Sequence, residues 1–123
     1  MNDNKLLGRW GEAAAAEYLR KKGYKIVGMG YHNRFGEIDI IAENRKFVAF
    51  VEVKTRKNAD FATAREFVDR HKRQRIITAA RLWLAETGSE KQPRFDVIEI
   101  YAPEGYETKK PELNHMESAF WEE

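Results

Sequence analysis

The chain of 123 residues, with 42% hydrophobic residues and a formal net charge of +2, has the size and apolar content of one domain, residues 1–123, and not of two. It contains no cysteine, which excludes disulfide bonds, thiolate zinc sites and cysteine nucleophiles. Its longest apolar run, residues 47–51, is far below the ~20 residues that span a bilayer, so we expect a cytoplasmic protein without membrane contact.

The first half of the chain predicts one helix and three strands. Residues 6–22 are rich in Ala, Leu and charged residues that favour a helix, and the following Gly23 suits its C-cap. Apolar residues between glycines indicate a strand within residues 24–31. Residues 37–42 and 47–54 are β-branched, aromatic and partly alternating, and the polar tetrapeptide between them predicts a β-hairpin.

The second half predicts a further helix and at least one more strand. An apolar stripe at helical spacing predicts a helix over residues 63–87 that ends at Gly88; the stripe is formed by Ile76, Ile77, Ala80, Trp83 and Leu84. Residues 94–101 alternate between two prolines and indicate a strand, and the aromatic pair Phe120 and Trp121 suggests a last short strand. The order αβββαβ(β) predicts a mixed α/β fold.

Charge is unevenly distributed along this order of elements. Residues 54–81 carry nine Lys and Arg against three Asp and Glu, whereas residues 82–123 carry four against ten. A basic segment of this kind indicates a polyanionic partner, although a solvated helix face is the commoner cause. Composition alone therefore leaves both interpretations open.

The predicted hairpin carries the residues with the clearest chemical meaning, Asp39, Glu52 and Lys54. Side chains alternate along a strand, so the loop length decides which of them share a face. A loop of residues 43–46 sets Asp39 diagonal to Glu52, and a loop of residues 44–47 sets the two directly opposite. Either even loop places both acids and Lys54 on one side of the sheet, whereas an odd loop without a bulge separates them.

Two neighbouring carboxylates beside an ammonium group suit a hard divalent cation, Mg²⁺ or Mn²⁺, better than zinc. Such a cation polarises a phosphate oxygen and lowers the pKa of bound water, and Lys54 then orients the water or stabilises the developing charge. The alternative is a solvent-facing hairpin with an ordinary surface salt bridge, which spacing alone makes about equally probable. The apolar neighbours Val48 and Phe50 favour a functional site.

These residues resemble the PD-(D/E)XK nuclease superfamily, and more closely its YraN-like branch of uncharacterised proteins. The resemblance rests on Gly36-Glu37-Ile38-Asp39-Ile40-Ile41 and Phe50-Val51-Glu52-Val53-Lys54-Thr55-Arg56, and extends to Gly8-Arg9-Trp10-Gly11-Glu12, Lys72-Arg73, Arg94-Phe95-Asp96-Val97 and Ala119-Phe120. It implies a restriction-endonuclease-like mixed sheet flanked by helices, similar to archaeal Holliday-junction resolvases. It also implies Asp39 and Glu52 as metal ligands, Lys54 as the catalytic lysine, and a homodimer. The superfamily's proline before the first aspartate is replaced by Ile38.

The resemblance also assigns Glu12 to the catalytic group. On a helix, Glu12 shares a row with Gly8, Ala16 and Leu19, which are small or apolar and would let the helix lie close to the sheet. An ordinary exposed glutamate is about as probable, because the alanine run obscures which face is buried.

The basic residues after the hairpin are the expected contacts to a nucleic-acid backbone, namely Arg56, Lys57, Lys72 and Arg73. Lys72 and Arg73 lie near the edges of the apolar stripe, which would turn them toward the sheet. The leading hypothesis is a Mg²⁺- or Mn²⁺-dependent endonuclease acting on DNA, including branched or junction DNA. The alternatives are a nucleic-acid-binding module without useful catalysis and a phosphodiesterase with another substrate.

The remaining polar and aromatic residues receive structural interpretations. No histidine is spaced with another ligand in a metal-binding pattern. Arg94 and Asp96 are expected to form strand-edge salt bridges. Trp10, Trp83 and Trp121 each have apolar neighbours and stand apart from the basic segment, so we expect them in the core or an interface and not as stacking platforms for bases.

Overall fold

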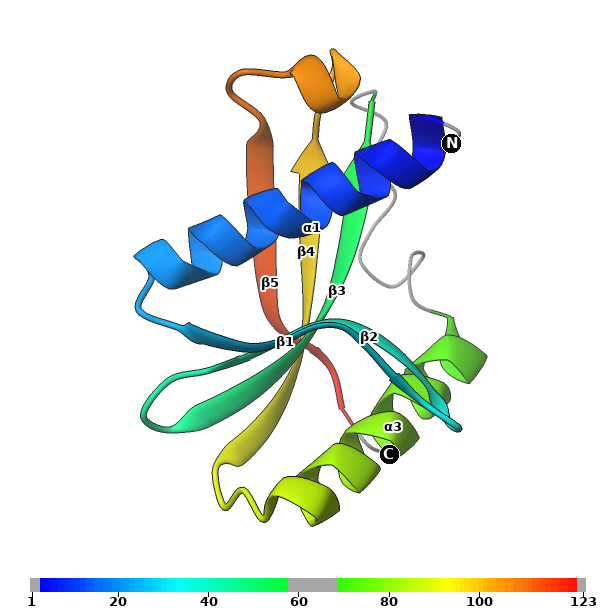
Figure 1. Ribbon diagram of the computed structural model, residues 1–123, viewed down its shortest axis with the longest axis vertical. Helices are drawn as coiled ribbons and strands as arrows, with labels where there is room; N and C mark the ends of the chain where they lie inside the picture. Colours follow the sequence, from blue (N-terminus) through cyan, green and yellow to red (C-terminus); the bar gives the residue numbers. More distant parts are fainter. Residues whose placement is uncertain (1–2, 58–68, 122–123) are drawn as a thin grey trace.

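The computed structural model describes residues 3–57 and 69–121 (Figure 1). Its elements in chain order are α1 (Asp3–Lys21), β1 (Lys25–Asn33), β2 (Gly36–Glu43), β3 (Phe47–Arg56), α3 (Arg70–Thr87), β4 (Gln92–Tyr101), the 3₁₀ helix η1 (Gly105–Glu107) and β5 (Glu112–Phe120). The five strands form one sheet in the order β1-β2-β3-β4-β5, in which β3 and β4 are parallel and the other neighbours antiparallel. The predicted mixed α/β fold with two flanking helices is confirmed.

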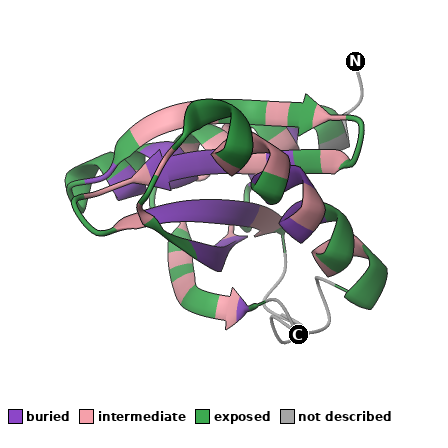
Figure 2. Cartoon of the chain, turned by 90° about the horizontal axis from the view of Figure 1, so that it is seen from below, coloured by how far each residue is buried: buried purple, intermediate pink, exposed green. Residues whose placement is uncertain are grey.

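The two helices cover opposite faces of the sheet, and each covers its own apolar cluster (Figure 1). Alternation along β3 sends Val48 and Phe50 to the α3 face and Ala49 and Val51 to the α1 face. Phe50 packs edge-to-face against Trp83 of α3, with ring centroids 5.7 Å apart. Figure 2 shows the resulting layers, with the centre of the sheet buried and the outer surfaces of the helices exposed.

The helix ends follow local sequence signals. Gly23 after α1 and Gly88 after α3 have φ angles of 95° and 68°, a left-handed conformation that glycine adopts without strain. Asp69 caps the start of α3, where its side chain accepts a hydrogen bond from the backbone N–H of Lys72 at 2.8 Å. Of the helix predicted over residues 63–87, residues 70–87 are helical, and residues 63–68 lie outside the described residues.

The C-terminal strand is longer than the sequence indicated. β5 has nine residues and pairs with β4 from Phe95 to Tyr101, with an irregularity between Phe95 and Val97. β4 is therefore an interior strand with β3 on its other side. The element order is αβββαββ, which includes the last strand that the aromatic pair Phe120 and Trp121 suggested.

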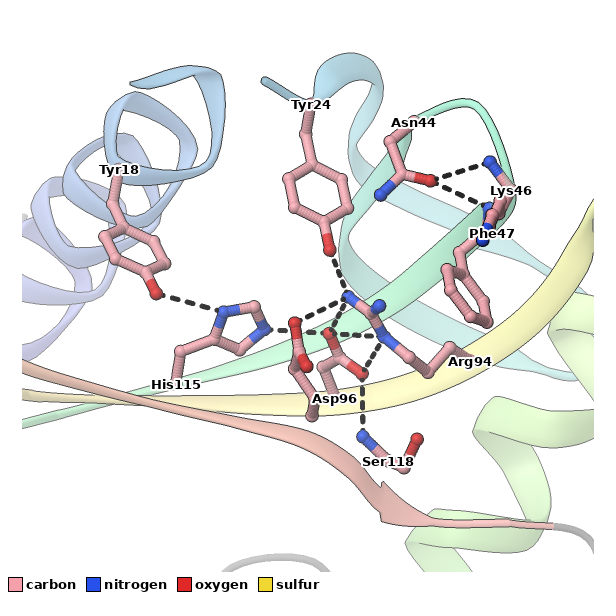
Figure 3. A network of polar contacts seen from close by, with 10 residues as sticks. Tyr18, Tyr24, Asn44, Lys46, Phe47, Arg94, Asp96, His115 and Ser118 are labelled. Atoms are coloured by element: carbon pink, nitrogen blue, oxygen red, sulfur yellow. Dashed lines mark hydrogen bonds and ion pairs between the residues drawn. The ribbon is translucent and has the colours of Figure 1, made fainter. Parts of the chain in front are cut away.

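The predicted salt bridge between Arg94 and Asp96 is present (Figure 3). Its expected place at a strand edge is wrong, because β4 lies inside the sheet between β3 and β5 and both side chains are buried. The Asp96 carboxylate is fully buried and accepts hydrogen bonds from Arg94 Nε at 2.9 Å, the Ser118 backbone N–H at 3.1 Å, and a nitrogen of His115 at 2.8 Å. Burial opposes its ionisation, but the contacts with His115 and Arg94 outweigh burial and lower the pKa of Asp96. His115 also contacts the hydroxyl of Tyr18 at 3.2 Å, so the network links β4, β5 and α1.

Neither α-helix of the described part is long and apolar enough to cross a membrane.

Candidate functional site

The β2–β3 hairpin has the register that brings Asp39 and Glu52 together. Ile41 pairs with Phe50 and Glu43 with Val48, which corresponds to a loop of residues 44–47, one of the two even loops considered above. The described ladder ends at the pair Ile40 and Val51, and one further step sets Asp39 opposite Glu52. There the Asp39 side chain accepts a hydrogen bond from the Val53 backbone N–H at 2.8 Å. The two strands thus carry two carboxylates at the point where their backbone pairing stops.

Glu52 is a buried carboxylate held between two lysine ammonium groups. Only 5% of Glu52 is exposed. Lys54, two residues further along the same face of β3, places Nζ 3.5 Å from Oε1 of Glu52, and Lys72 from the first turn of α3 donates a hydrogen bond to the same oxygen. A buried charge of this kind is tolerated only when it is paired.

Lys72 reaches Glu52 because α3 starts close to the beginning of β2. A Cβ atom on Gly36 would lie 3.1 Å from the carbonyl oxygen of Arg75 and 3.2 Å from its Cβ, so glycine permits this approach. The first turn of α3 contains Arg70, Lys72 and Arg73 and no acidic residue. Cations at a helix N-terminus oppose the helix dipole, which favours anions there. The carboxylates that this turn meets are the N-cap Asp69 and, through Lys72, Glu52.

Glu12 approaches the same site from α1, on the other face of the sheet. The preceding Gly11 lies so close to β3 that a Cβ atom there would be 1.9 Å from Oγ1 of Thr55. Glu12 is half-buried, and its pKa is raised first by burial and then by the charges of Glu37 and Glu52. The interpretation of Glu12 as an ordinary exposed glutamate is wrong, and its assignment to the catalytic group stays a prediction.

The ionisable groups of the site have shifted pKa values, and the two lysines shift in opposite directions. Burial, followed by the charge of Glu52, raises the pKa of Asp39 to about 7, although the Val53 N–H opposes this shift. Burial lowers the pKa of Lys54, and the neighbouring Lys72 lowers it further. Burial also disfavours the charged form of Lys72, but its contact with Glu52 outweighs burial and raises the pKa of Lys72. Of the two amines on Glu52, Lys54 is therefore the one that gives up its proton more readily.

The donor set at Asp39 and Glu52 fits a hard divalent cation. A cation between the two carboxylates relieves the repulsion and burial that raise the pKa of Asp39. No group of three or more acidic, histidine or cysteine side chains within residues 3–57 and 69–121 is arranged to hold a metal alone. Mg²⁺ is bound in many sites by one or two carboxylates, with water and substrate phosphate completing its shell, so two acids suffice.

The predicted nucleic-acid contacts separate into two places. Lys72 lies in the site, and Arg73 follows it on α3 in a shallow hollow that Arg70 and Trp121 also line. Arg56 and Lys57 lie at the end of β3 instead, where a Cβ atom on Gly105 would meet Lys57 Cε at 3.4 Å. The structure therefore brings Lys72 to Glu52, places Arg73 in the hollow beside Trp121, and leaves Lys57 beside η1.

Two features of the site were not predicted from the sequence. Lys72 was expected to hold phosphate and instead contacts Glu52 directly. Glu99 is the other: it is 4% exposed, pairs in register with Lys54, and its Oε2 has no hydrogen-bond partner among the described residues. The sequence did contain a signal for Glu99. Phe95, Val97 and Glu99 are alternate residues of one strand and share a face, so an acid stands where the series predicts an apolar residue.

The fold and site together define a mixed α/β protein with a carboxylate and lysine cluster where a β-hairpin meets two helices. The model of the uncharacterised protein family UPF0102 matches residues 11–100. The chain is 43% identical over 120 residues to a UPF0102 protein of Caldanaerobacter subterraneus, covering 96% of this chain and 97% of the relative. It is 45% identical over 121 residues to one of Prosthecochloris aestuarii, covering 95% and 94%. The chain belongs to the UPF0102 family.

Proposed function

We propose that this protein is a divalent-metal-dependent endonuclease that hydrolyses phosphodiester bonds in DNA, with Mg²⁺ or Mn²⁺ as its cofactor. The observation that carries the proposal is the pair Asp39 and Glu52 where β2 and β3 stop pairing, with Lys54 beside Glu52. The resemblance to PD-(D/E)XK nucleases, noted from the sequence, supports the same assignment. The proposal includes a cytoplasmic location, which rests on the composition of the sequence, and a homodimer, which rests on the resemblance to resolvases.

The side chains have distinct roles in this proposal. Asp39 and Glu52 would hold the metal ion, which when bound would supply Lewis-acid polarisation of the scissile phosphate and activation of water. Lys54 positions the attacking water and accepts its proton, a role that its lowered pKa favours. Lys72 exchanges its contact with Glu52 for one with the negatively charged phosphate. Glu12 holds a water molecule from the α1 side.

DNA is the proposed substrate because the site lies next to the N-terminal turn of α3. The cations Arg70, Lys72 and Arg73 of this turn attract the phosphates of a nucleic-acid backbone. Contacts of this kind position a backbone and carry no base sequence. We therefore propose selection by DNA shape, with branched or junction DNA as the first substrates to examine.

Incubation of purified protein with Mn²⁺ or Mg²⁺ and linear, nicked, flapped and four-way DNA tests the proposal. We expect cleavage that Glu52→Gln abolishes, because the amide is a poor metal ligand and leaves two ammonium groups without their carboxylate. Glu43→Gln is the matched control, since Glu43 also lies on the hairpin but pairs with Lys91 at 3.4 Å. Cleavage that persists in Glu52→Gln would sink the proposed site.

The second candidate is a nucleic-acid-binding module without turnover. The contact of Lys72 with Glu52 favours it, because this ammonium already neutralises the carboxylate that a metal requires. That function predicts DNA binding that persists in chelator, weakens with salt, and is never followed by cleavage. Binding measured in EDTA and cleavage measured in Mn²⁺ on the same substrates separate the two functions.

A further inference from the structure

Trp121 is the most exposed of the large hydrophobic residues in the described part of the chain, with 67% of its surface accessible. This exposure excludes a place in the core, and the expectation of an interface stays a prediction. The preceding residue, Phe120, is 4% exposed and stacks on Phe95, with ring centroids 5.3 Å apart. The end of β5 is thus anchored by one aromatic ring while the next is presented to solvent.

Trp121 lies between two hollows of different character. The first is a small one on α3, lined by Arg70, Arg73, Gln74 and Ile77, which helical spacing places along one side of the helix. The second is a pocket of about 420 Å³ at the start of β4, lined by residues that include Pro93, Arg94, Phe95 and Phe120. The second pocket has a mixed lining, since Gln92 and Ser118 also border it. A flat indole with two arginines on one side and this mixed pocket on the other can contact both parts of a nucleotide, which carries phosphate at one end and an aromatic base at the other.

This position is close to the proposed cleavage site. Phe120 pairs with Phe95, and Val97, two residues along β4, pairs with Glu52. At ~3.4 Å per residue along a strand and ~4.8 Å between strands, Phe120 and Glu52 are roughly 12 Å apart. That separation corresponds to about three or four stacked nucleotides at ~3.4 Å each.

We propose that Trp121 is a stacking platform for an unpaired base, while Arg70 and Arg73 bind the phosphates of the same strand. The inference rests on the proposed function and names its substrate class, a DNA strand with unpaired nucleotides beside the cleavage site. Base stacking on an aromatic ring requires a free π-face, which a paired and stacked base in a duplex does not offer. The two arginines favour this occupant over a second copy of the chain, because a twofold contact centred on the hollow that they line would bring the arginines of both copies together.

Binding measured in EDTA, where no cleavage occurs, isolates the contribution of the base. The probes are a fluorescent oligothymidylate of about 15 nucleotides and an abasic oligomer with the same number of phosphates. We expect the wild type to bind the thymidylate more tightly, by roughly 5- to 150-fold if one base stacks. Trp121→Ala is expected to remove this preference and leave the affinity for the abasic oligomer unchanged, whereas Trp121→Phe keeps most of it.

Two controls make the test specific. Tyr106→Ala removes another exposed aromatic ring, which is 47% accessible and lies on η1, and is expected to change neither affinity. Arg70→Gln with Arg73→Gln is expected to weaken binding of both oligomers and to reduce the dependence of log affinity on log salt by about 0.7 per charge.

Each other outcome overturns the inference. Equal affinity of the wild type for both oligomers means that no base is stacked. Equal weakening of both by Trp121→Ala means that Trp121 acts through the fold or the charges. A change from dimer to monomer caused by Trp121→Ala, seen by sedimentation, assigns the indole to a self-contact. The proposed function fails separately, because absence of cleavage in Mn²⁺ leaves base-dependent binding in EDTA intact.

Discussion

Replacing Gly11 by alanine tests how closely α1 lies against β3. The new Cβ atom would lie 1.9 Å from Oγ1 and 3.1 Å from Cβ of Thr55. Rotation of the threonine relieves the first contact but not the second, so the helix must also shift. Alanine normally stabilises a helix by about 1 kcal/mol relative to glycine, and overpacking costs about 1–3 kcal/mol. We expect Gly11→Ala to lower the free energy of unfolding by up to about 2 kcal/mol.

Gly8 is the matched control, because it lies on the same helix one turn earlier and an added Cβ atom meets nothing within 4 Å. Gly8→Ala should raise the free energy of unfolding by about 0.5–1 kcal/mol. Urea unfolding of both variants measures the difference. Gly11→Ala with Thr55→Ala should recover only part of the loss, because the Cβ atom of residue 55 remains 3.1 Å from the new methyl group. If Gly11→Ala is as stable as Gly8→Ala, the close approach that positions Glu12 does not exist.

Three further substitutions test the buried charges and the core. Asp96→Asn should cost about 3 kcal/mol near pH 7, since it leaves Arg94 buried without its carboxylate. The folded-state pKa of Asp96 is lowered, so the stabilisation by its carboxylate is present above pH ~4 and is lost as the pH falls further. In urea titrations the free energies of unfolding of the wild type and Asp96→Asn should therefore converge toward pH ~2. A difference that stays constant with pH would contradict this. Lys72→Gln should tighten Mn²⁺ binding without DNA by about fivefold in calorimetry, because Lys72 competes for Glu52; weaker binding would show that it does not compete. Phe50→Ala should cost about 3–5 kcal/mol in urea unfolding, because this side chain is fully buried between two aromatic rings, and a loss below 1 kcal/mol would contradict that packing.

The hairpin was predictable from sequence because its signals are local. Side-chain alternation and a polar loop of even length predict Asp39 and Glu52 on one face of the sheet, and the observed loop of residues 44–47 is the one of the two considered that sets them opposite each other. The contact of Lys72 with Glu52 depends on two residues twenty positions apart and on the approach of α3 to Gly36. No local pattern encodes such a contact, so the sequence placed Lys72 near the site without identifying its partner.

The C-terminal strand shows a different limit. Of the nine residues of β5, Phe120 alone is fully buried, so the apolar alternation that marks a strand is weak there. Its pairing with β4 comes from a tertiary neighbour and not from its own sequence. Phe120 ends the strand in the core, whereas Trp121 follows the strand and is exposed.

The buried polar cluster around Asp96 and the candidate site around Asp39 and Glu52 differ in how well their charges are satisfied. Asp96 has a hydrogen-bond donor on each oxygen, and its lowered pKa shows that the fold favours its charge. At the candidate site the local rules conflict: burial raises the pKa of Asp39, two ammonium groups share one oxygen of Glu52, and Oε2 of Glu99 has no partner in the described residues. Conflicts of this kind gather at functional sites. A divalent cation at Asp39 and Glu52, with phosphate at the start of α3, would relieve the first two together, which is why we place the activity on this side of the sheet.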